Sequence, residues 1–551
     1  MRNYAPMTGA KALADALQAA GVRCIFSLSG NQIMPVFDAL IGRDIRLVHV
    51  RHEAAAVYAA EAWAQLTGEI GVALVTAGAG FGNALGALIS ARASESPVLL
   101  LSGDSPRGQD GMGAFQELDQ CAMSAPVTKA SLRGGSADTL APEAAALIRR
   151  AREGRPGPVH LALPADVLTD PVTGQPEVNV TPAVQGLDAD TLADLRAFLD
   201  GAARPLILTG PALSNTRTQG AVTRAQGVLN VPVLCMESPR GLRDPALGAL
   251  VDVTRQADRI ILLGKPGDFT TGFLGADMGN EKTQFAVIDP DEAEISRARA
   301  RLGRRLSLAA CADSLPVLHA LSARADAPAR MEWMRDATAA LAARATLAPD
   351  ALEGPDGLHP AAVAQALGAI LRAHPEAVLI SDGGEFGQWI QTVAHDGPRV
   401  INGVSGAIGA APAYALAASL ARPGALVITA MGDGTAGFLL AEYETAAREG
   451  AQFIAVIGND SCWNAEHQIQ IREFGPDRTH SCGLSRMARY DVAAQGLGIV
   501  GMVVEDGQIG TLTQALTSAL AQRSPVCLNI RIRPEPAPVV TASKAPAGAV
   551  H

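Results

Sequence analysis

Two apolar segments, each followed by glycine, constrain the fold of this chain more than any other feature. Residues 425–430 (ALVITA) and 453–457 (FIAVI) have the length and β-branched content of strands buried on both faces of a sheet. The first segment leads into Gly432-Asp433-Gly434, and the second leads into Gly458-Asn459. A helix is expected over residues 438–448, so the whole stretch predicts a right-handed crossover between two parallel strands.

Asp433 and Asn459 directly follow the two predicted strands, so both are expected at the carboxyl edge of one sheet. A carboxylate, an amide oxygen and a backbone carbonyl near Ser461 are suitable ligands for Mg²⁺, which shares its remaining positions with phosphates. The glycines permit close backbone approach, and the N-terminus of the following helix offers N–H groups to an anion. A Gly-Asp-Gly sequence alone is also compatible with an ordinary turn of an α/β domain.

The rest of the chain repeats the alternation of short apolar strands with helices. Helices are expected over residues 9–20, 34–40 and 54–66, and strands over 24–26, 45–48, 71–75, 231–234, 260–263, 285–288 and 378–380. This alternation is typical of α/β domains with doubly wound, mainly parallel sheets. A chain of 551 residues with 48% hydrophobic residues is long and apolar enough for several such domains.

Charge, cysteine content and hydropathy exclude several classes of protein. The net charge is -10 and no basic stripe is visible, so nucleic acid is not an expected partner. The seven cysteines include no CxxC pair, which is typical of reduced thiols in a cytoplasmic protein. The start lacks the apolar core of a signal peptide, and no apolar run reaches the ~18 residues of a membrane span, so we expect neither export nor a membrane partner.

The motifs resemble those of the thiamin-diphosphate-dependent enzymes. In that family a GDG sequence is followed by an Asn after roughly two dozen residues, and here 24 residues separate Gly434 from Asn459. Residues 51–104, from RHEAAAVYAAEAWA to PVLLLSGD, resemble the family's pyrimidine-binding domain nearly end to end. The segments SDGGEF, GNDSCW and HSCGL most resemble the acetolactate-synthase-like and 2-hydroxyacyl-CoA lyase group, with benzaldehyde-lyase-type enzymes more distant.

The resemblance implies three α/β domains with mainly parallel sheets and a tail. The expected divisions are residues 1–170 for pyrimidine binding, 190–325 for a central Rossmann-like domain, 355–533 for diphosphate binding, and 534–551 for a flexible tail. The tail is interpreted as disordered or as a lid over the site. No G-x-G-x-x-G follows the first strand of the central domain, so a nicotinamide cofactor is not supported.

The resemblance also assigns candidate site residues. Glu53, which follows Arg-His, is expected to contact N1′ of the cofactor's aminopyrimidine and to activate the thiazolium ring, although a first-turn Glu is also favoured by the helix dipole alone. Gln116 in the AFQE segment is expected to contact substrate or to lie in a polar loop. Glu466 is expected to relay protons or to remain an exposed helix residue. The expected metal ligands are Asp433, Asn459 and Ser461. The expected cofactor-binding residues are Gly30, Asn83, Asp382, Gly383, Gly384, Gly406, Ile408, Gly432, Asp433, Gly434, Thr435, Asn459 and Trp463.

These assignments predict a thiamin-diphosphate- and Mg²⁺-dependent carbon–carbon lyase or carboligase that acts on 2-keto acids or 2-hydroxyacyl compounds. A homodimer is the expected minimum and a homotetramer the expected assembly, because relatives form the site between two subunits. Three alternatives remain at this point: an FAD-containing oxidoreductase of the pyruvate-oxidase type, a cofactor-binding subunit without turnover, and a nucleotide-binding module without thiamin. FAD is possible, but the sequence does not support it.

Overall fold

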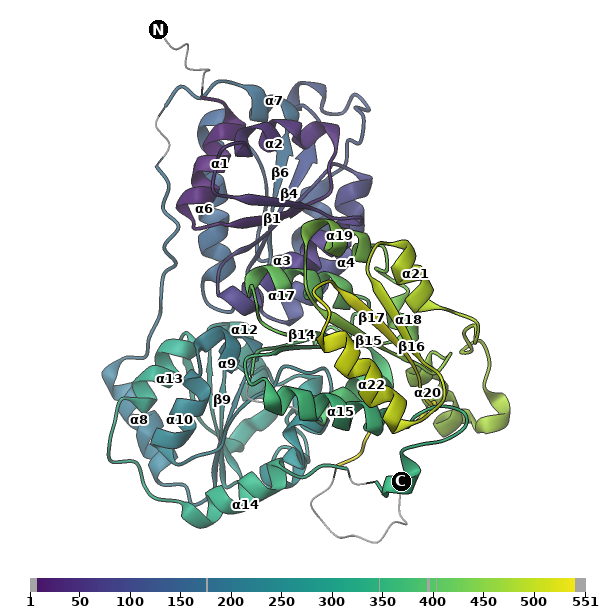
Figure 1. Cartoon of the computed structure of the whole chain (residues 1–551). Coiled ribbons are helices and arrows are strands. Elements are labelled where there is room, and N and C mark those ends of the chain that lie inside the picture. The colour runs from purple at the N-terminus through teal and green to yellow at the C-terminus, as the bar shows by residue number, and fades with distance from the viewer. Residues whose placement is uncertain (1–6, 175–176, 346, 394–396, 403, 541–551) are drawn as a thin grey trace.

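The computed structural model describes residues 7–174, 177–345, 347–393, 397–402 and 404–540. Within these residues the chain forms three α/β domains, each built on one parallel sheet (Figure 1). The first domain lies at the top of the view, the central domain at the lower left, and the third domain at the right. The three-domain α/β class expected from the sequence is confirmed.

The first domain contains a six-stranded sheet in the order β2-β1-β3-β4-β6-β5. Its strands are β1 (Cys24–Ser27), β2 (Arg46–His49), β3 (Gly71–Val75), β4 (Val98–Asp104), β5 (Ser131–Arg133) and β6 (Val159–Pro164). Its helices are α1 (Gly9–Ala19), α2 (Met34–Leu40), α3 (Glu53–Thr67), α4 (Ala79–Ala93), α5 (Gln120–Ser124), α6 (Ala137–Arg152) and α7 (Ala165–Thr169).

The central domain contains a five-stranded sheet in the order β11-β10-β9-β7-β8. Its strands are β7 (Pro205–Thr209), β8 (Val233–Cys235), β9 (Arg259–Leu263), β10 (Gln284–Asp289) and β11 (Leu306–Cys311). Its helices are α8 (Ala189–Asp200), α9 (Asn215–Thr218), α10 (Ala221–Leu229), α11 (Leu250–Gln256), α12 (Glu292–Leu302), α13 (Ser314–Ser322) and α14 (Met331–Leu341).

The third domain repeats the strand order of the first, as β13-β12-β14-β15-β17-β16. Its strands are β12 (Val378–Asp382), β13 (Arg399–Ile401), β14 (Val427–Gly432), β15 (Ile454–Asn459), β16 (Val500–Val504) and β17 (Val526–Arg531). Its helices are α15 (Pro360–Ala373), α16 (Gly384–Gln391), α17 (Ala411–Ala421), α18 (Asp433–Ala436), α19 (Glu442–Glu449), α20 (Asn464–Phe474), α21 (Tyr490–Gly496) and α22 (Ile509–Leu520).

The predicted strands are confirmed, because each matches an observed strand whose ends differ by at most two residues. The crossover from β14 to β15 is also confirmed, since the two strands pair in parallel with Gly432 opposite Gly458. The helix expected over residues 438–448 is wrong at its start. The chain first forms the single turn of α18, passes through turns, and begins α19 only at Glu442.

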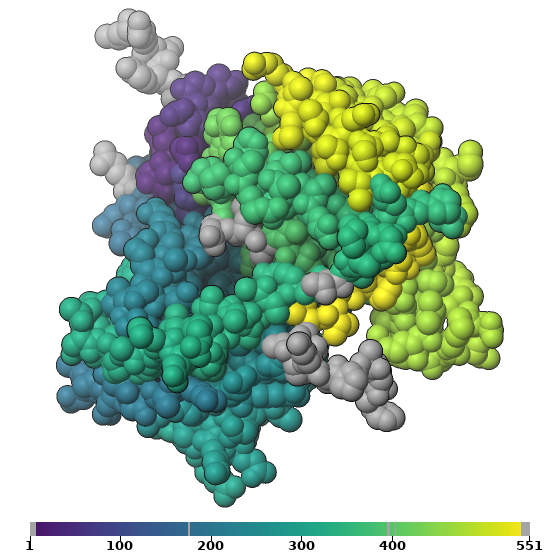
Figure 2. All heavy atoms as spheres, turned by 60° about the horizontal axis from the view of Figure 1, so that its bottom comes forward, coloured from purple at the N-terminus to yellow at the C-terminus, as the bar shows by residue number. Residues whose placement is uncertain are grey.

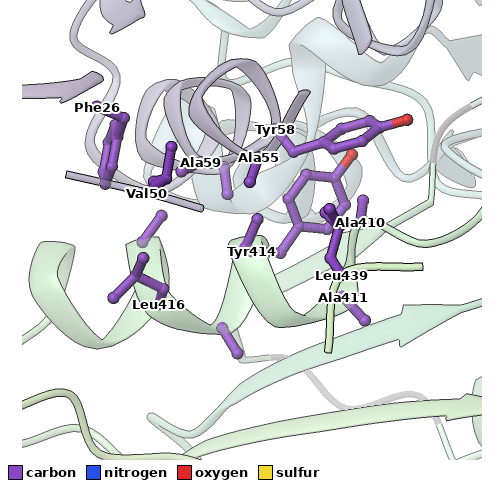
Figure 3. Packing of buried hydrophobic residues seen from close by; sticks show 14 of the residues in the cluster. Phe26, Val50, Ala55, Tyr58, Ala59, Ala410, Ala411, Tyr414, Leu416 and Leu439 are labelled. Carbon is purple, nitrogen blue, oxygen red and sulfur yellow. The ribbon is translucent and has the colours of Figure 1, made fainter. Parts of the chain in front are cut away.

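One continuous apolar core joins the first and third domains through α3 and α17. Both helices are rich in alanine and almost wholly buried, which lets their backbones approach closely (Figure 3). The rings of Tyr58 and Tyr414 meet edge-on with centroids 5.8 Å apart, a geometry worth about 0.5–1.5 kcal/mol beyond burial. The Tyr414 hydroxyl donates to the buried Glu61 carboxyl at 2.9 Å, so a polar bond fixes the same contact.

The segment after β17 passes along the third domain. Residues 534–540 lie against α16 and α20, where the Pro536 carbonyl accepts a hydrogen bond from the Trp389 indole at 2.9 Å. Residues 541–551 of the expected tail lie outside the described residues. No helix in the described part of the chain is long and apolar enough to cross a membrane.

Candidate active site

The carboxyl ends of β14 and β15 bring two acidic side chains together. Asp433 follows β14 and is 2% exposed, and its carboxylate accepts the Gly434 N–H at 3.0 Å. Asp460 follows β15, and its carboxyl is hydrogen-bonded to that of Asp433. Burial raises the pKa of both carboxyls, and the negative charge of Asp433 raises the pKa of Asp460 further. Both shifts have the direction expected for two buried carboxyls that repel each other when no cation lies between them.

Asn459 faces the opposite side of the strand end. Its amide donates to Asn529 Oδ1 at 3.1 Å, and its oxygen accepts from the Ser461 N–H at 3.2 Å. Asn459, Asn529 and Arg531 line a separate hollow, which Asp433 and Asp460 do not line. Successive side chains of an extended chain point to opposite faces, so Asn459 and Asp460 cannot both face Asp433.

Both oxygens of Ser461 already have hydrogen-bond partners. Its hydroxyl accepts from the Arg531 guanidinium at 2.7 Å, and its carbonyl accepts from Leu484 N–H at 2.7 Å. Asp460, which the sequence reasoning did not single out, is the side chain that faces Asp433. The alternation of side chains along the predicted strand was the signal that could have found it.

A glycine-lined cavity of about 70 Å³ lies beside the two carboxyls. Gly383 has a φ of +80°, and a Cβ there would lie 2.1 Å from Thr435 Oγ1. A Cβ on Gly434 would lie 2.7 Å from the Trp463 ring. Only glycine fits at both positions, so no side chain stands between the backbone and the cavity there. The lining of this cavity includes the predicted site residues Gly383, Gly384, Ile408, Gly432, Asp433, Gly434, Thr435, Trp463 and Glu466.

A second cavity of about 250 Å³ shares Gly383, Gly384 and Ile408 with the first. The half-buried Ile408 therefore separates two connected spaces. Gly406 also lines the second cavity and has a φ of +72°. Gly403, which opens the same glycine-rich loop, lies outside the described residues.

Asp382 lines neither of these two cavities but holds the loop that carries Ile408. Its carboxylate accepts from the N–H groups of Gly409 at 3.1 Å and Ala411 at 2.8 Å. The Asn402 amide donates to its other oxygen at 2.9 Å. Burial raises the pKa of Asp382 to about 7. The structure thus places this residue behind the loop rather than at the cavity surface.

The first domain carries a second cluster, centred on Glu53. Glu53 begins α3, is 8% exposed, and accepts a hydrogen bond from the Asn83 amide at 3.0 Å. A Cβ on Gly80 would lie 3.1 Å from its Oε1 atom, so the turn that opens α4 passes directly over the carboxylate.

Gln116 lies at the edge of this cluster, in a backbone conformation with a φ of +62°. Its Oε1 atom accepts from the Gln32 amide at 2.7 Å, and Gln32 in turn accepts from the Thr76 hydroxyl at 2.6 Å. A Cβ on Gly30 would lie 2.1 Å from that hydroxyl, so Gly30 belongs to the same edge. The structure gathers Gly30, Glu53, Asn83 and Gln116 at the carboxyl end of the first sheet.

Among the described residues, the Glu53 cluster lines neither of the two cavities beside Asp433. Neither cavity beside Gly383 and Gly384 is lined by Glu53, Asn83 or Gln116. The third domain contacts the first beside Glu53, where Glu442 accepts the Arg51 N–H at 2.9 Å.

Comparison with known proteins agrees with this division into two clusters. Residues 7–123 match the model of the thiamine pyrophosphate enzyme N-terminal TPP binding domain, and residues 382–530 match that of the C-terminal TPP binding domain. The acetolactate synthase large subunit IlvG of Mycobacterium tuberculosis is 29% identical over 549 residues, which cover 96% of each chain. The 2-hydroxyacyl-CoA lyase 2 of Xenopus laevis is 30% identical over 552 residues, which cover 88% of this chain and 84% of the lyase.

A solved structure shows the same fold. The thiamine diphosphate-dependent 4-hydroxybenzoylformate decarboxylase of Rhodococcus jostii RHA1 superposes with a TM-score of 0.78 at 22% identity. The superposition covers 96% of this chain and 99% of the decarboxylase.

Proposed function

The chain belongs to the thiamine pyrophosphate enzyme family, and from this premise we propose that it is a Mg²⁺-dependent carbon–carbon lyase or carboligase of the acetolactate synthase and 2-hydroxyacyl-CoA lyase type. Its substrates in this proposal are 2-keto acids or 2-hydroxyacyl compounds. The observation that carries the proposal is the pair of facing carboxyls, Asp433 and Asp460, beside a glycine-lined cavity.

The donor set fits Mg²⁺, a hard cation that prefers oxygen ligands and shares them with phosphates. Asp433 and Asp460 supply the carboxylates, since a bound dication would neutralise the repulsion between them. The N–H of Cys462 points to Asp460 Oδ1 at 3.1 Å. In an extended residue the N–H and carbonyl face the same side, so the Cys462 carbonyl is our third ligand. This set replaces Asn459 and Ser461 of the sequence-based prediction.

The glycine cavity fits the diphosphate of the cofactor. Backbone N–H groups near Gly383 and Gly384 can approach an anion closely, because Gly383 has no room for a side chain and Gly384 has a φ of +22°. Ile408, between the two cavities, supports the cofactor where its diphosphate arm meets its rings. When bound, the cofactor supplies a nucleophilic carbon and an electron sink.

The chain's own residues move protons and orient the reactants. Glu53 is buried and held by Asn83, a setting in which it hydrogen-bonds N1′ of the aminopyrimidine and exchanges a proton there. Gln116 orients the substrate carbonyl, and Glu466 at the mouth of the glycine cavity transfers protons to the product.

Glu53 acts, in our proposal, on the cofactor held by a second copy of the chain. The support is that Glu53 lines neither cavity beside Asp433 in its own chain. A homodimer is then the smallest active species, and we propose a homotetramer as the assembly. We also propose a cytoplasmic location, because all seven cysteines are free thiols.

A flavin in the central domain is the alternative that purified protein tests most simply. Dinucleotide phosphates bind in open α/β sheets where the strand order reverses, which here is between β7 and β9. Glu95 of the first domain lies at that crevice, where its carboxylate accepts the Ala212 N–H at 2.9 Å and pairs with Arg155, and a cavity of about 310 Å³ remains beside it. The sequence does not support FAD, so in our proposal purified protein shows no flavin absorbance near 450 nm, which separates it from the oxidoreductase alternative.

Cofactor titration and a substrate screen test the proposal. Protein stripped with a chelator should bind thiamin diphosphate only after Mg²⁺ is restored. The loaded enzyme should then release carbon dioxide from a 2-keto acid or an aldehyde from a 2-hydroxyacyl-CoA. Absence of Mg²⁺-dependent binding contradicts the site, and binding without turnover across both substrate sets favours the non-catalytic subunit.

A further inference from the structure

The backbone just before Glu53 is held by a side chain of the third domain. Glu442 begins α19 and is 1% exposed, and its Oε1 atom accepts the backbone N–H of Arg51 at 2.9 Å. Its Oε2 atom accepts the Thr445 hydroxyl at 2.7 Å, so both carboxylate oxygens have partners. Burial raises the pKa of Glu442, and hydrogen bonds from Thr445 and from the backbone N–H groups of Arg51 and His52 oppose that rise.

Further side chains of α19 contact the same segment of the first domain. The pairs are Glu444 with the Arg51 guanidinium at 3.6 Å, Glu449 with the Arg46 guanidinium at 2.8 Å, and Arg448 with the His49 carbonyl. Figure 1 shows α19 at the boundary between the two domains, beside α3 and α4, and Figure 2 shows purple atoms of the first domain against green atoms of the third. One helix of the third domain thus holds the chain from β2 to the start of α3.

The segment that Glu442 contacts has little support of its own. Arg51 and His52 lie between β2 and α3, where neither strand pairing nor helix bonds hold the backbone. Glu53 follows directly, so the position of this backbone sets where its carboxylate lies, and Asn83 holds only the far end of the side chain at 3.0 Å. A misplacement of about 1 Å between reacting groups can lower a rate about 100-fold.

An acidic residue in the first turn of a helix is also favoured by the helix dipole alone. That interaction requires neither burial nor a partner from another domain, and Glu444 in the same turn is only half-buried. Glu442 instead carries its charge into the contact between two domains, where a charge is costly unless it is hydrogen-bonded. Its bond to Arg51 therefore has a use beyond the stability of α19.

We propose that Glu442 is a positioning residue for the Glu53 of its own chain. The inference rests on the proposed function, in which this Glu53 serves the cofactor held by the partner chain. Glu442 follows the Asp433 turn along the sequence, yet its hydrogen bonds run to the first domain and to Thr445. In a dimer it therefore supports the site opposite the one that its own Asp433 builds.

The first test needs no cofactor. Glu442→Gln keeps the size of the side chain but removes the charge that accepts the Arg51 N–H. Amide hydrogen exchange at Arg51 and His52, measured by mass spectrometry, should become about tenfold faster in this variant. Glu444→Gln is the matched control and should change this exchange less than about twofold, because its half-exposed pair holds a side chain rather than the backbone. Equal amide exchange in wild type and Glu442→Gln overturns the inference.

The second test uses protein loaded with thiamin diphosphate and Mg²⁺. Exchange of the thiazolium C2 proton with solvent should slow by about 10–100-fold in Glu442→Gln, while cofactor affinity stays within about twofold. Thr445→Val, which lacks the hydroxyl that holds Glu442, should slow the same exchange by a smaller factor. Normal C2 exchange in both variants contradicts the positioning role. If wild-type protein binds no cofactor, the proposed function fails, and the amide exchange still decides the inference.

Mixed dimers assign Glu442 to one of the two sites. When Glu442→Gln is added to the Asp433→Asn chain and mixed with Glu53→Gln, the one working site uses the Glu53 beside the altered residue. Activity should then fall about 10–100-fold below that of the mixture of the two single variants. When Glu442→Gln is added to the Glu53→Gln chain instead, the mixture with Asp433→Asn should lose no activity. The reverse result means that Glu442 serves the metal turn of its own chain, and it refutes the inference.

Discussion

Replacement of Asp460 by Asn tests the metal site most directly. In the structure Asp460, not Asn459, faces the Asp433 carboxylate, so Asp460→Asn removes one of the two negative charges available to the cation. Substitutions that merely touch a metal ligand already cost about 10–100-fold in affinity, so loss of a charged ligand should cost at least ~100-fold. In the metal-free protein the same change relieves repulsion between two buried carboxyls, and stability should stay equal or rise.

The size of the effect follows from binding linkage. A cofactor and metal mixture at about 100 times its Kd stabilises the folded protein by about 2.7 kcal/mol. After a ~100-fold loss of affinity the same mixture contributes only about 0.4 kcal/mol. The difference corresponds to about 5–9 °C in the midpoint of thermal unfolding for a domain of ~150–250 residues.

Thermal unfolding with and without thiamin diphosphate and Mg²⁺ measures this difference, and Asn459→Ala supplies the contrast. Asn459→Ala should lower the midpoint in both conditions, because it breaks the hydrogen bonds to Asn529 and Ser461 at about 1–3 kcal/mol. The midpoint of thermal unfolding of Asn459→Ala should nevertheless rise by the full wild-type amount when cofactor and metal are added. The reverse pattern, with the shift retained in Asp460→Asn and lost in Asn459→Ala, refutes the geometric assignment.

Three further outcomes are expected. Glu53→Gln and Asp433→Asn should each be inactive alone. After the two variants are mixed and their subunits reassembled, about a quarter of wild-type activity should return, because half of the dimers are mixed and each mixed dimer has one intact site of two. No recovery on mixing means that both residues serve the site of one chain. Burial lowers the pKa of His160 to about 3, so below pH 6.5 only the unfolded chain takes up a proton at this side chain. The free energy of unfolding, measured with denaturant, should therefore be about 2 kcal/mol lower at pH 5 than at neutral pH. A loss of the same size in His160→Gln contradicts this origin. Tyr414→Phe leaves the buried Glu61 carboxyl without one hydrogen-bond donor and should lower the free energy of unfolding by about 1–3 kcal/mol. An unchanged free energy means that this bond does not stabilise the contact between the first and third domains.

The local elements of this protein could be predicted from its sequence. The apolar runs of β14 and β15 mark strands buried on both faces, and the glycines after them mark the turns. The glycines near residue 383 were located on the same grounds, whereas Glu53 at the start of α3 was singled out only by the resemblance to thiamin-diphosphate-dependent enzymes. These features depend on side chains within a few residues of each other, so periodicity and glycine content are sufficient evidence.

Tertiary structure alone decided how those elements meet. Asn459 turns toward Asn529 on β17 and leaves the face of Asp433 to Asp460, a choice set by strand pairing rather than by the Asn itself. The same holds for Glu95, which reaches a crevice of another domain, and for the C-terminal segment that forms a cavity wall. The sequence determined which residues end each strand, because backbone sterics and burial act locally. The fold determined which of them face each other, because that depends on contacts between segments far apart in the chain.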